Sequence, residues 1–296
     1  MALNAFIEYL SLEKNYSQHT VLAYKTDIEA CSAFFGLTFE GASVENANYG
    51  QLRTWVVHLV NQGITNRSVN RKMSSLKAYY RFLLKTSCIN VNPLANHKAL
   101  KTPKKVEVPF SEAEMEKVLE SIPSKSTFEG VRDKLIIELF YATGIRRAEL
   151  VNLKVTDIDF GNNTIKVLGK RNKERIVPLL PFLKEGIQLY LQYRAEVVNS
   201  KTADNLILVK NGDKIYETLV YRIINGYFSK ASSKAKKSPH VLRHTFATHL
   251  LNQGASLNSV KELLGHSSLA STQVYTHNSI AELKKAHSHA HPRNKE

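Results

Sequence analysis

Residues 238–251 read SPHVLRHTFATHLL, the pattern of a helix that begins with an anion site. Ser238 is a residue type that caps helices, and Pro239 suits the first helical position because its ring already holds the helical φ. His240 then lies in the first turn, where free backbone amides and the helix dipole favour negative charge. Arg243 follows on the same face of the helix. The stretch therefore predicts a site the size of a phosphate group.

A second polar position lies at the break in TGIRRAEL, residues 143–150. Gly144 fits the end of one helix, where a left-handed residue is common, and Arg146 then opens a short second helix. Glu149 lies one turn after Arg146 and can orient its guanidinium group. A solvated surface arginine is the alternative, as the adjacent Arg147 illustrates.

Residues 156–180 change from helical to strand chemistry. The segments DIDF, TIKVLG and ERIVPLL are separated by the turn sequences GNN and KRNK, which predicts three antiparallel strands joined by hairpins. Lys170 follows Gly169 in the second hairpin turn, where a solvated lysine is the ordinary case. Later, in LLGHSSLASTQVYTH, His266 comes directly after a helix end, and a short helix is expected to lead to Tyr275.

Composition limits the partners of this protein. The chain has 296 residues, enough for two domains, and a net charge of +15. Such a charge favours polyanions, with nucleic acid first and an anionic membrane surface second. No run approaches the roughly 18 apolar residues that span a bilayer, and the N-terminus lacks a secretory pattern. With only two cysteines, a disulfide framework is excluded, so we expect a soluble cytoplasmic protein.

Helical patterns fill the first part of the chain. Ser17 is the expected cap of a helix that runs to Phe35, and further helices are expected over residues 47–61 and 66–85. The stretch that follows holds three prolines and a lysine cluster, which disfavour helix. The predicted parts are an N-terminal domain over residues 1–90, a basic linker over 91–107 and a C-terminal domain over 108–296.

Six positions, taken in order, carry the chemistry: Arg146, Lys170, His240, Arg243, His266 and Tyr275. With these motifs the chain resembles the tyrosine recombinase (phage integrase) family and is close to its Xer-type members, which resolve chromosome dimers at cell division. The resemblance covers nearly the whole chain, from YSQHTVLAYKTDI at 16–28 to HPR at 291–293. It implies a mainly α fold of two domains: a four-helix SAM-like core-binding domain, then a helical catalytic domain with a small three-stranded antiparallel sheet.

The resemblance also implies site-specific cleavage and rejoining of DNA. The Tyr275 hydroxyl would attack a phosphate, form a 3′-phosphotyrosyl link and release a 5′-hydroxyl, so that rejoining needs no ATP. Arg146 and Arg243 match the two arginines that clamp the phosphate in this family, and His266 matches a third contact to it.

Two further positions match proton-transfer roles. His240 matches a residue that hydrogen-bonds near the nucleophile and takes its proton, and Lys170 matches the lysine that protonates the leaving oxygen. These cations supply the charge that magnesium supplies in two-metal nucleases, so no metal and no other cofactor is expected. The closely spaced His287, His289 and His291 fit no closed zinc site.

The implied partners follow from the same resemblance. Double-stranded DNA with a specific site is the expected substrate, and a set of residues on the helix over 66–85 is expected to face its major groove: Arg67, Asn70, Arg71 and Ser74. The basic loop 229–237 is expected to touch phosphate. The tail from Asn278 onward predicts an amphipathic helix, which in this family docks into a neighbouring protomer.

At synapsis we expect a tetramer, formed by copies of this chain or together with a related recombinase. We expect this tetramer at the nucleoid, and a DNA translocase of the FtsK type activates some relatives.

Three other interpretations remain open at this point. An integrase of a mobile element would use the same chemistry, and a type IB topoisomerase a related one. A non-catalytic DNA-binding protein would need decayed catalytic positions, yet all six are filled.

Overall fold

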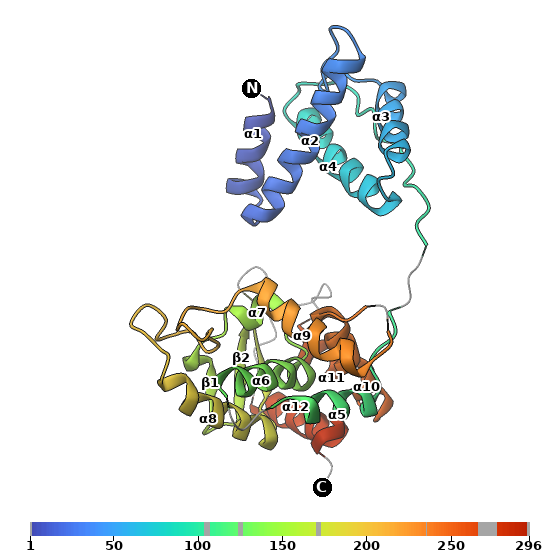
Figure 1. Ribbon diagram of the computed structural model, residues 1–296. Helices are drawn as coiled ribbons and strands as arrows, with labels where there is room; N and C mark the ends of the chain where they lie inside the picture. The colour runs from blue at the N-terminus through green and yellow to red at the C-terminus, as the bar shows by residue number, and fades with distance from the viewer. Residues whose placement is uncertain are drawn as a thin grey trace. The chain divides into compact units, whose positions relative to one another are not determined.

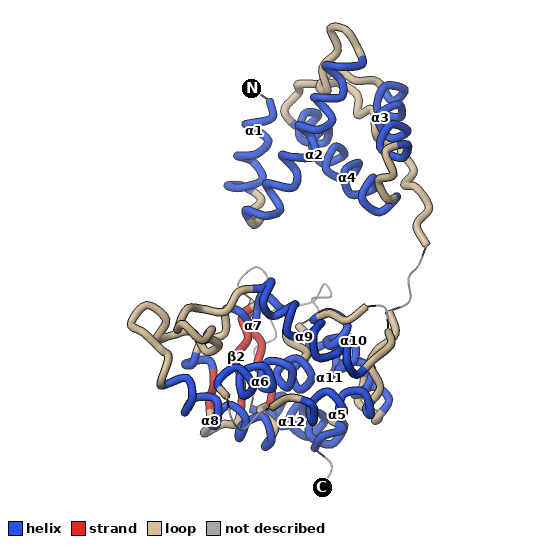
Figure 2. Tube along the Cα trace, viewed as in Figure 1, coloured by secondary structure: helices blue, strands red, loops and turns tan. Residues whose placement is uncertain are grey.

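The computed structural model describes residues 2–103, 107–123, 127–169, 173–234, 236–265 and 277–294 (Figure 1). Contacts divide the chain into two compact units, Met1–Lys105 and Val106–Glu296, which are described one at a time. Helix dominates both, and the strands of the described part all lie in the second unit (Figure 2). Within these residues no helix is long and apolar enough to cross a membrane.

The first unit contains these helices: α1 (Ala2–Glu8), a π-helical turn (Tyr9–Glu13), α2 (Gln18–Thr38), α3 (Tyr49–Asn61) and α4 (Asn66–Lys85). Ser17, Asn48 and Thr65 cap α2, α3 and α4, each by accepting a hydrogen bond from a backbone amide of the first turn. The apolar faces meet around the buried Trp55. The expected four-helix domain is confirmed.

The segment that follows α4 stays attached to the first unit. Leu94 is buried in its core, and Asn70 of α4 exchanges two hydrogen bonds of 2.8 Å with the backbone of Leu100. Lys77 donates to the carbonyl oxygen of His97 at 2.9 Å. Residues 94–101 therefore pack along α4, although the sequence placed them in the linker, because their backbone groups find partners on that helix.

The second unit contains the remaining helices and the sheet: α5 (Glu112–Ser121), α6 (Phe128–Thr143), α7 (Arg147–Val151), a 3₁₀ turn (Val155–Asp157), β1 (Ile158–Asp159), β2 (Thr164–Leu168), β3 (Glu174–Pro178), α8 (Pro181–Ala195), α9 (Glu217–Ala231), α10 (Pro239–Asn252), α11 (Leu257–Leu264), α12 (His277–Ala290) and a final 3₁₀ turn (Pro292–Asn294). The strands form one antiparallel sheet in the order β1-β2-β3, as the hairpin pattern predicts.

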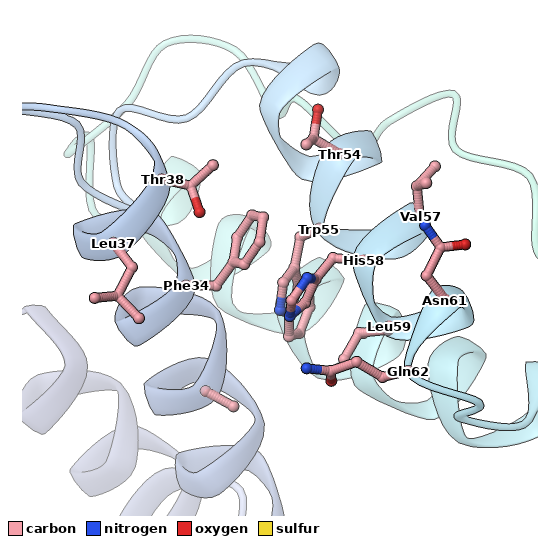
Figure 3. A pocket seen from close by; sticks show the side chains of 11 residues that line it. Phe34, Leu37, Thr38, Thr54, Trp55, Val57, His58, Leu59, Asn61 and Gln62 are labelled. Carbon is pink, nitrogen blue, oxygen red and sulfur yellow. The ribbon is translucent and has the colours of Figure 1, made fainter.

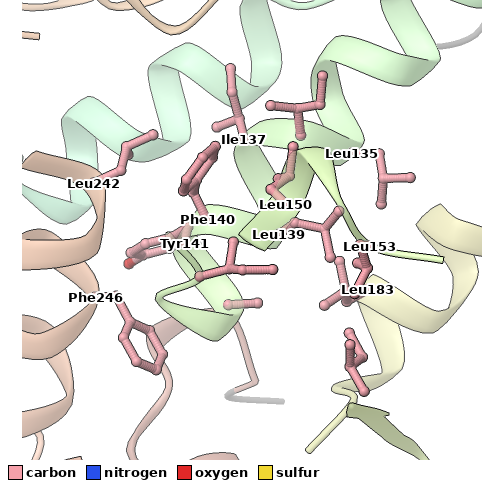
Figure 4. Packing of buried hydrophobic residues seen from close by; sticks show 14 of the residues in the cluster. Leu135, Ile137, Leu139, Phe140, Tyr141, Leu150, Leu153, Leu183, Leu242 and Phe246 are labelled. Atoms are coloured by element: carbon pink, nitrogen blue, oxygen red, sulfur yellow. The ribbon is translucent and has the colours of Figure 1, made fainter. Parts of the chain in front are cut away.

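Helix α6 runs through the core of the second unit. It packs against α8 and α10, and Figure 4 shows its Phe140 and Tyr141 on the side of Phe246 of α10. Fourteen of its sixteen residues are buried, so the helix is covered on all its faces. Gly130 lies in its first turn. Only glycine fits there, because an added Cβ would lie 1.9 Å from the carbonyl oxygen of Pro123.

The inner face of the sheet contributes a buried arginine to the candidate site described below. Ile165 of β2 pairs with Val177 of β3, and Val167 pairs with Arg175, so that these side chains alternate with exposed ones along the strands. Arg175 is 3% exposed despite its charge. A buried guanidinium on the inner face of a strand needs acceptors, and they come from α7 and α11.

Candidate active site

Arg146 lies at the start of α7, directly after the left-handed turn that ends α6. Gly144 has φ +57°, and a Cβ on it would lie 2.5 Å from the ring of Phe246, so glycine is required there. The carboxylate of Glu149 accepts from the Arg146 backbone amide at 2.8 Å and from its Nη1 at 2.6 Å. The guanidinium group is held in place, and its side chain remains 33% exposed.

Glu149 is the single carboxylate of this cluster with two arginine partners. Its second oxygen also accepts from Arg175 Nη2 at 2.8 Å. Burial would raise the pKa of Glu149, but the hydrogen bond and charge of Arg175, followed by the bonds from Arg146, outweigh it and lower that pKa to about 2. Glu149 is therefore ionised at neutral pH and fixes both guanidinium groups.

Arg243 projects from α10 into the same cluster and is 7% exposed. Its Nη1 donates to the carbonyl oxygen of Gly144, and its Nη2 donates to that of Leu264 at 2.6 Å. Burial, then the charges of Arg146 and Arg175, lower the pKa of Arg243 to about 9, which leaves it charged at neutral pH. Two guanidinium groups thus pair with Glu149 and a third bonds only carbonyl oxygens, and the excess positive charge favours an anion.

His240 lies in the first turn of α10, one turn before Arg243. Ser238 caps the helix and Pro239 is its first residue, as the sequence predicts. The imidazole is 74% exposed, and its Nε2 lies 3.7 Å from a carboxylate oxygen of Glu107. The side chain is therefore accessible from solvent, in contrast to the buried Arg243.

Lys170, His266 and Tyr275 lie outside the described residues. The two glycines that precede the first two of them are described, and both face Arg175. A Cβ on Gly169 would lie 3.5 Å from Glu149 Oε1, and one on Gly265 would lie 3.0 Å from Arg175 Cδ. The backbone next to both positions thus reaches the arginine cluster.

Arg175 is the residue of this cluster that sequence reasoning missed. The strand pattern ERIVP contained the signal, because Arg175 and Val177 share one face and Val177 is apolar. An arginine at an inward position of a strand requires a buried acceptor.

The four residues expected to face DNA all lie on α4, but they differ in their contacts. Arg67 and Ser74 are exposed. Arg71 is half exposed and donates to both oxygens of the buried Asp27 of α2. The side-chain amide of Asn70 donates to the Leu100 carbonyl oxygen and accepts from the Leu100 backbone amide. A DNA base would have to compete with those two hydrogen bonds.

Two lysines of the loop 229–237 also have partners. Lys234 pairs with Glu114, and Lys236 pairs with Glu107, which lies beside His240. A phosphate group would compete with these carboxylates, so the loop offers less free positive charge than its sequence indicates.

Within this chain the C-terminal helix packs on its own unit, and its docking into a neighbouring protomer stays a prediction. Leu283 is buried, His287 Nε2 contacts the Ala142 carbonyl oxygen at 2.7 Å, and His291 Nε2 contacts that of Tyr141 at 3.1 Å. Arg293 donates to Glu138 at 2.8 Å. Across the described ranges no group of three His, Cys, Asp or Glu side chains could hold a metal ion.

A groove of about 610 Å³ lies in the first unit, between α2 and α3 (Figure 3). Its walls are mostly apolar, and the rings of Phe34 and His58 lie 4.7 Å apart within it. It contains no pair of acid and base or of nucleophile and base. The chemistry of the described residues is therefore concentrated at the arginine cluster.

Comparison with known proteins gives matches over both units. Residues 110–282 match the Phage integrase family, and residues 3–87 match its N-terminal SAM-like domain. The chain is 40% identical over 294 residues to the tyrosine recombinase XerC of Anoxybacillus flavithermus, covering 98% of this chain and 97% of that protein. It is 36% identical over 292 residues to XerC of Bacillus subtilis, covering 97% and 95%.

Solved structures agree with these matches. The XerH site-specific recombinase bound to a palindromic difH substrate, in a post-cleavage complex, gives a TM-score of 0.72 at 25% identity and covers 93% of this chain and 81% of that one. The Tn1549 transposon integrase with circular intermediate DNA gives 0.69 at 21% identity, covering 95% and 98%. The second likeness supports the fold alone.

Proposed function

This chain belongs to the phage integrase family and is a tyrosine recombinase, an enzyme that cleaves and rejoins DNA, and we propose that it resolves chromosome dimers as a Xer-type recombinase. The observation that carries the proposal is the cluster in which Arg146 and Arg175 pair with the one carboxylate of Glu149 while the charged Arg243 lies close enough for both arginines to lower its pKa, which leaves an excess of positive charge. Full-length identity of 36–40% with XerC proteins supports the Xer-type role.

In this proposal Arg146 and Arg243 bind the non-bridging oxygens of the scissile phosphate. Negative charge grows on those oxygens in the five-coordinate transition state, and donors already held in place stabilise it without reorganisation. Glu149 holds Arg146, while backbone carbonyl oxygens hold Arg243. Because these carbonyls are neutral, a phosphate can displace them without breaking an ion pair.

The proton transfers and the nucleophile complete the reaction. Tyr275 attacks the phosphorus, His240 takes its proton, and His266 contacts the phosphate. Lys170 protonates the leaving 5′ oxygen, a form of help worth about 10²–10⁴ in rate. The free energy of the broken bond is kept in the phosphotyrosyl link, so the second transesterification returns an intact strand.

The first unit contributes the binding of duplex DNA. Arg67, Arg71 and Ser74 present polar groups on α4, and Asp27 binds the guanidinium group of Arg71. Asn70 acts through Leu100, which it fixes beside the same helix. We include in the proposal a tetramer at synapsis, formed with copies of this chain or with a related recombinase, and activation by a DNA translocase, in the cytoplasm and at the nucleoid.

The test is capture of the covalent intermediate on DNA that carries a candidate chromosomal site and a nick near the scissile phosphate. Wild-type protein should give a slow band on a denaturing gel, and peptide mapping should place the DNA on Tyr275. The variant Tyr275→Phe should bind the same DNA with near-normal affinity and give no such band. Normal DNA binding without any adduct from wild type would favour a non-catalytic DNA-binding protein.

The role of Lys170 is tested with a different DNA substrate. Lys170→Ala should cleave slowly on ordinary DNA and recover when sulfur replaces the 5′ bridging oxygen, because a thiolate leaves without a proton. Failure to recover would remove Lys170 from the acid role. Activity on a mobile-element end, with none on a chromosomal site, would favour an integrase.

A further inference from the structure

Arg175 has no part in the chemistry proposed so far, yet it is among the most buried charges of the second unit. It lies on β3 at the inner face of the sheet and is 3% exposed. Burial of a guanidinium group is unfavourable unless its donors are satisfied. The acceptors that it uses therefore indicate which parts of the unit it joins.

Those acceptors lie on two separate elements. Arg175 Nη2 donates to Glu149 Oε2 of α7 at 2.8 Å, and Nε donates to the Leu263 carbonyl oxygen of α11 at 2.9 Å. Glu149 in turn holds Arg146 through its other oxygen. One planar fork thus connects β3, the arginine at the start of α7 and the end of α11.

The end of α11 is shared with Arg243. The last carbonyl oxygens of a helix lack partners within it and carry partial negative charge. Arg175 takes that of Leu263, and Arg243 takes the adjacent one of Leu264 at 2.6 Å. Gly265 then turns the chain with φ +62°, and a Cβ there would lie 3.0 Å from Arg175 Cδ. The Arg175 side chain thus packs directly against the turn that precedes His266.

We propose that Arg175 is a positioning residue for strand cleavage, which ties the Arg146–Glu149 pair to the end of α11 and so sets the spacing of the two phosphate-binding arginines before DNA binds. This rests on the proposed function, since it assigns Arg146 and Arg243 to the phosphate. A fork is necessary because the two acceptors lie on different elements. Lysine has one donor head on a flexible stem and cannot bridge both acceptors with the same geometry.

The chain offers a matched control in Arg194 of α8. It is also a buried arginine, 8% exposed, and its donors also satisfy carbonyl oxygens, those of Thr202, Ala203 and Asn205. None of those residues contacts the arginine cluster in the described hydrogen bonds. Arg194→Lys should therefore lose a comparable set of bonds without any change at the site.

The experiment measures single-turnover formation of the covalent adduct on nicked DNA at saturating protein, well below the thermal midpoint of every variant. Arg175→Lys should slow adduct formation by about 10²-fold, because a displacement of about 1 Å of a phosphate ligand can cost that much. Its affinity for DNA should stay within about twofold of wild type. Arg194→Lys should cleave at the wild-type rate even if its thermal midpoint falls as far as that of Arg175→Lys.

A second substrate separates positioning of the phosphate clamp from an effect on the leaving group. With sulfur at the 5′ bridging position, Arg175→Lys should stay slow, whereas Lys170→Ala should recover. Arg175→Gln, which is neutral and has one short donor head, should be at least as slow as the lysine variant and serves if the latter fails to fold.

Three results would overturn the proposal: wild-type rates for a folded Arg175 variant, an equal loss of rate in Arg194→Lys, or rescue of Arg175→Lys by sulfur. Absence of an adduct from the wild-type protein would instead overturn the proposed function, so that the two failures can be told apart.

Discussion

Each unit of this protein contains a buried carboxylate that pairs with two cations, and the two clusters differ in how much positive charge they leave unpaired. In the first unit Asp27 is 1% exposed and accepts from Arg71, Lys72 and Ser75, all on α4. The side chain of Arg71 there is 53% exposed. In the second unit Glu149 is shared by Arg146 of α7 and Arg175 of β3.

The difference lies in where the cations come from and in how many there are. The Asp27 cluster joins two neighbouring helices, and water screens its outer cation. The Glu149 cluster joins three elements, and the buried Arg243 adds a third guanidinium group, whose hydrogen bonds within the described residues go to carbonyl oxygens and not to a carboxylate. The first arrangement holds two helices together, whereas the second creates a place for an anion.

The largest expected effect separates the two clusters by their chemistry. Arg243→Ala should lower the rate of adduct formation by about 10²–10³-fold at saturating DNA, because a preorganised donor to the transition state is lost. Arg71→Ala should leave that rate unchanged and weaken binding instead. The logarithm of its binding constant should depend less steeply on log salt, by about 0.9 per lost phosphate contact. An equal loss of rate in both would contradict the comparison.

Acid should affect the second unit first, because three of its buried histidines are neutral. Burial lowers the pKa of His287 to about 4 and that of His291 to about 3, and it also lowers that of His249. The unfolded chain binds these protons from about pH 6.5 downward while the folded chain does not, so stability should fall as pH drops below 6.5. For His287 the loss is on the order of 3 kcal/mol by pH 4.

The only tryptophan of the chain, Trp55, is buried in the first unit and reports on it alone. In an acid titration, circular dichroism should therefore show loss of helix before Trp55 emission changes. His291→Gln should move the first of these transitions to lower pH. Coincident transitions in the wild-type protein would argue against a difference between the two units.

Removal of one carboxylate at a time sharpens the comparison further. Asp27→Asn should reduce the free energy of unfolding of the first unit by about 1.5–3 kcal/mol, the range for hydrogen bonds to a charged group. The measurement is guanidinium unfolding followed by Trp55 emission. Glu149→Gln should leave that transition in place while it lowers the stability seen by circular dichroism.

The smallest expected effects come from the two capping boxes. Asn48 caps α3 with Gln51, and Ser111 caps α5 with Glu114. Replacement of either cap by alanine should cost about 1 kcal/mol, because one backbone amide loses its acceptor. Asn48→Ala should appear in Trp55 emission and Ser111→Ala should not.

The capping residues also show which features of the fold can be predicted from the local sequence. Ser17 and Ser238 cap the helices that the sequence assigns to them, and the three predicted strands form one antiparallel sheet. These features depend on partners within a few residues along the chain. The same holds for Gly144 and Gly265, whose left-handed backbone ends α6 and α11.

Features that depend on partners far away along the chain could not be predicted from the local sequence. Asn70 was expected to face DNA, and only the folded chain shows its amide bonded to Leu100. The sequence indicated only that the histidines of the tail fit no closed zinc site, and the folded chain shows His287 and His291 buried against α6. Arg175 finds its acceptors 26 and 88 residues away.

The sequence by itself determined the helices, the hairpins and the types of residue that this chemistry requires, because caps, turns and periodicity are local. Tertiary structure alone decided which cations are paired and which remain available to an anion. The physical reason is that the charge state and donor capacity of a side chain depend on burial and on its acceptors, and both are set by segments that meet only in the folded chain.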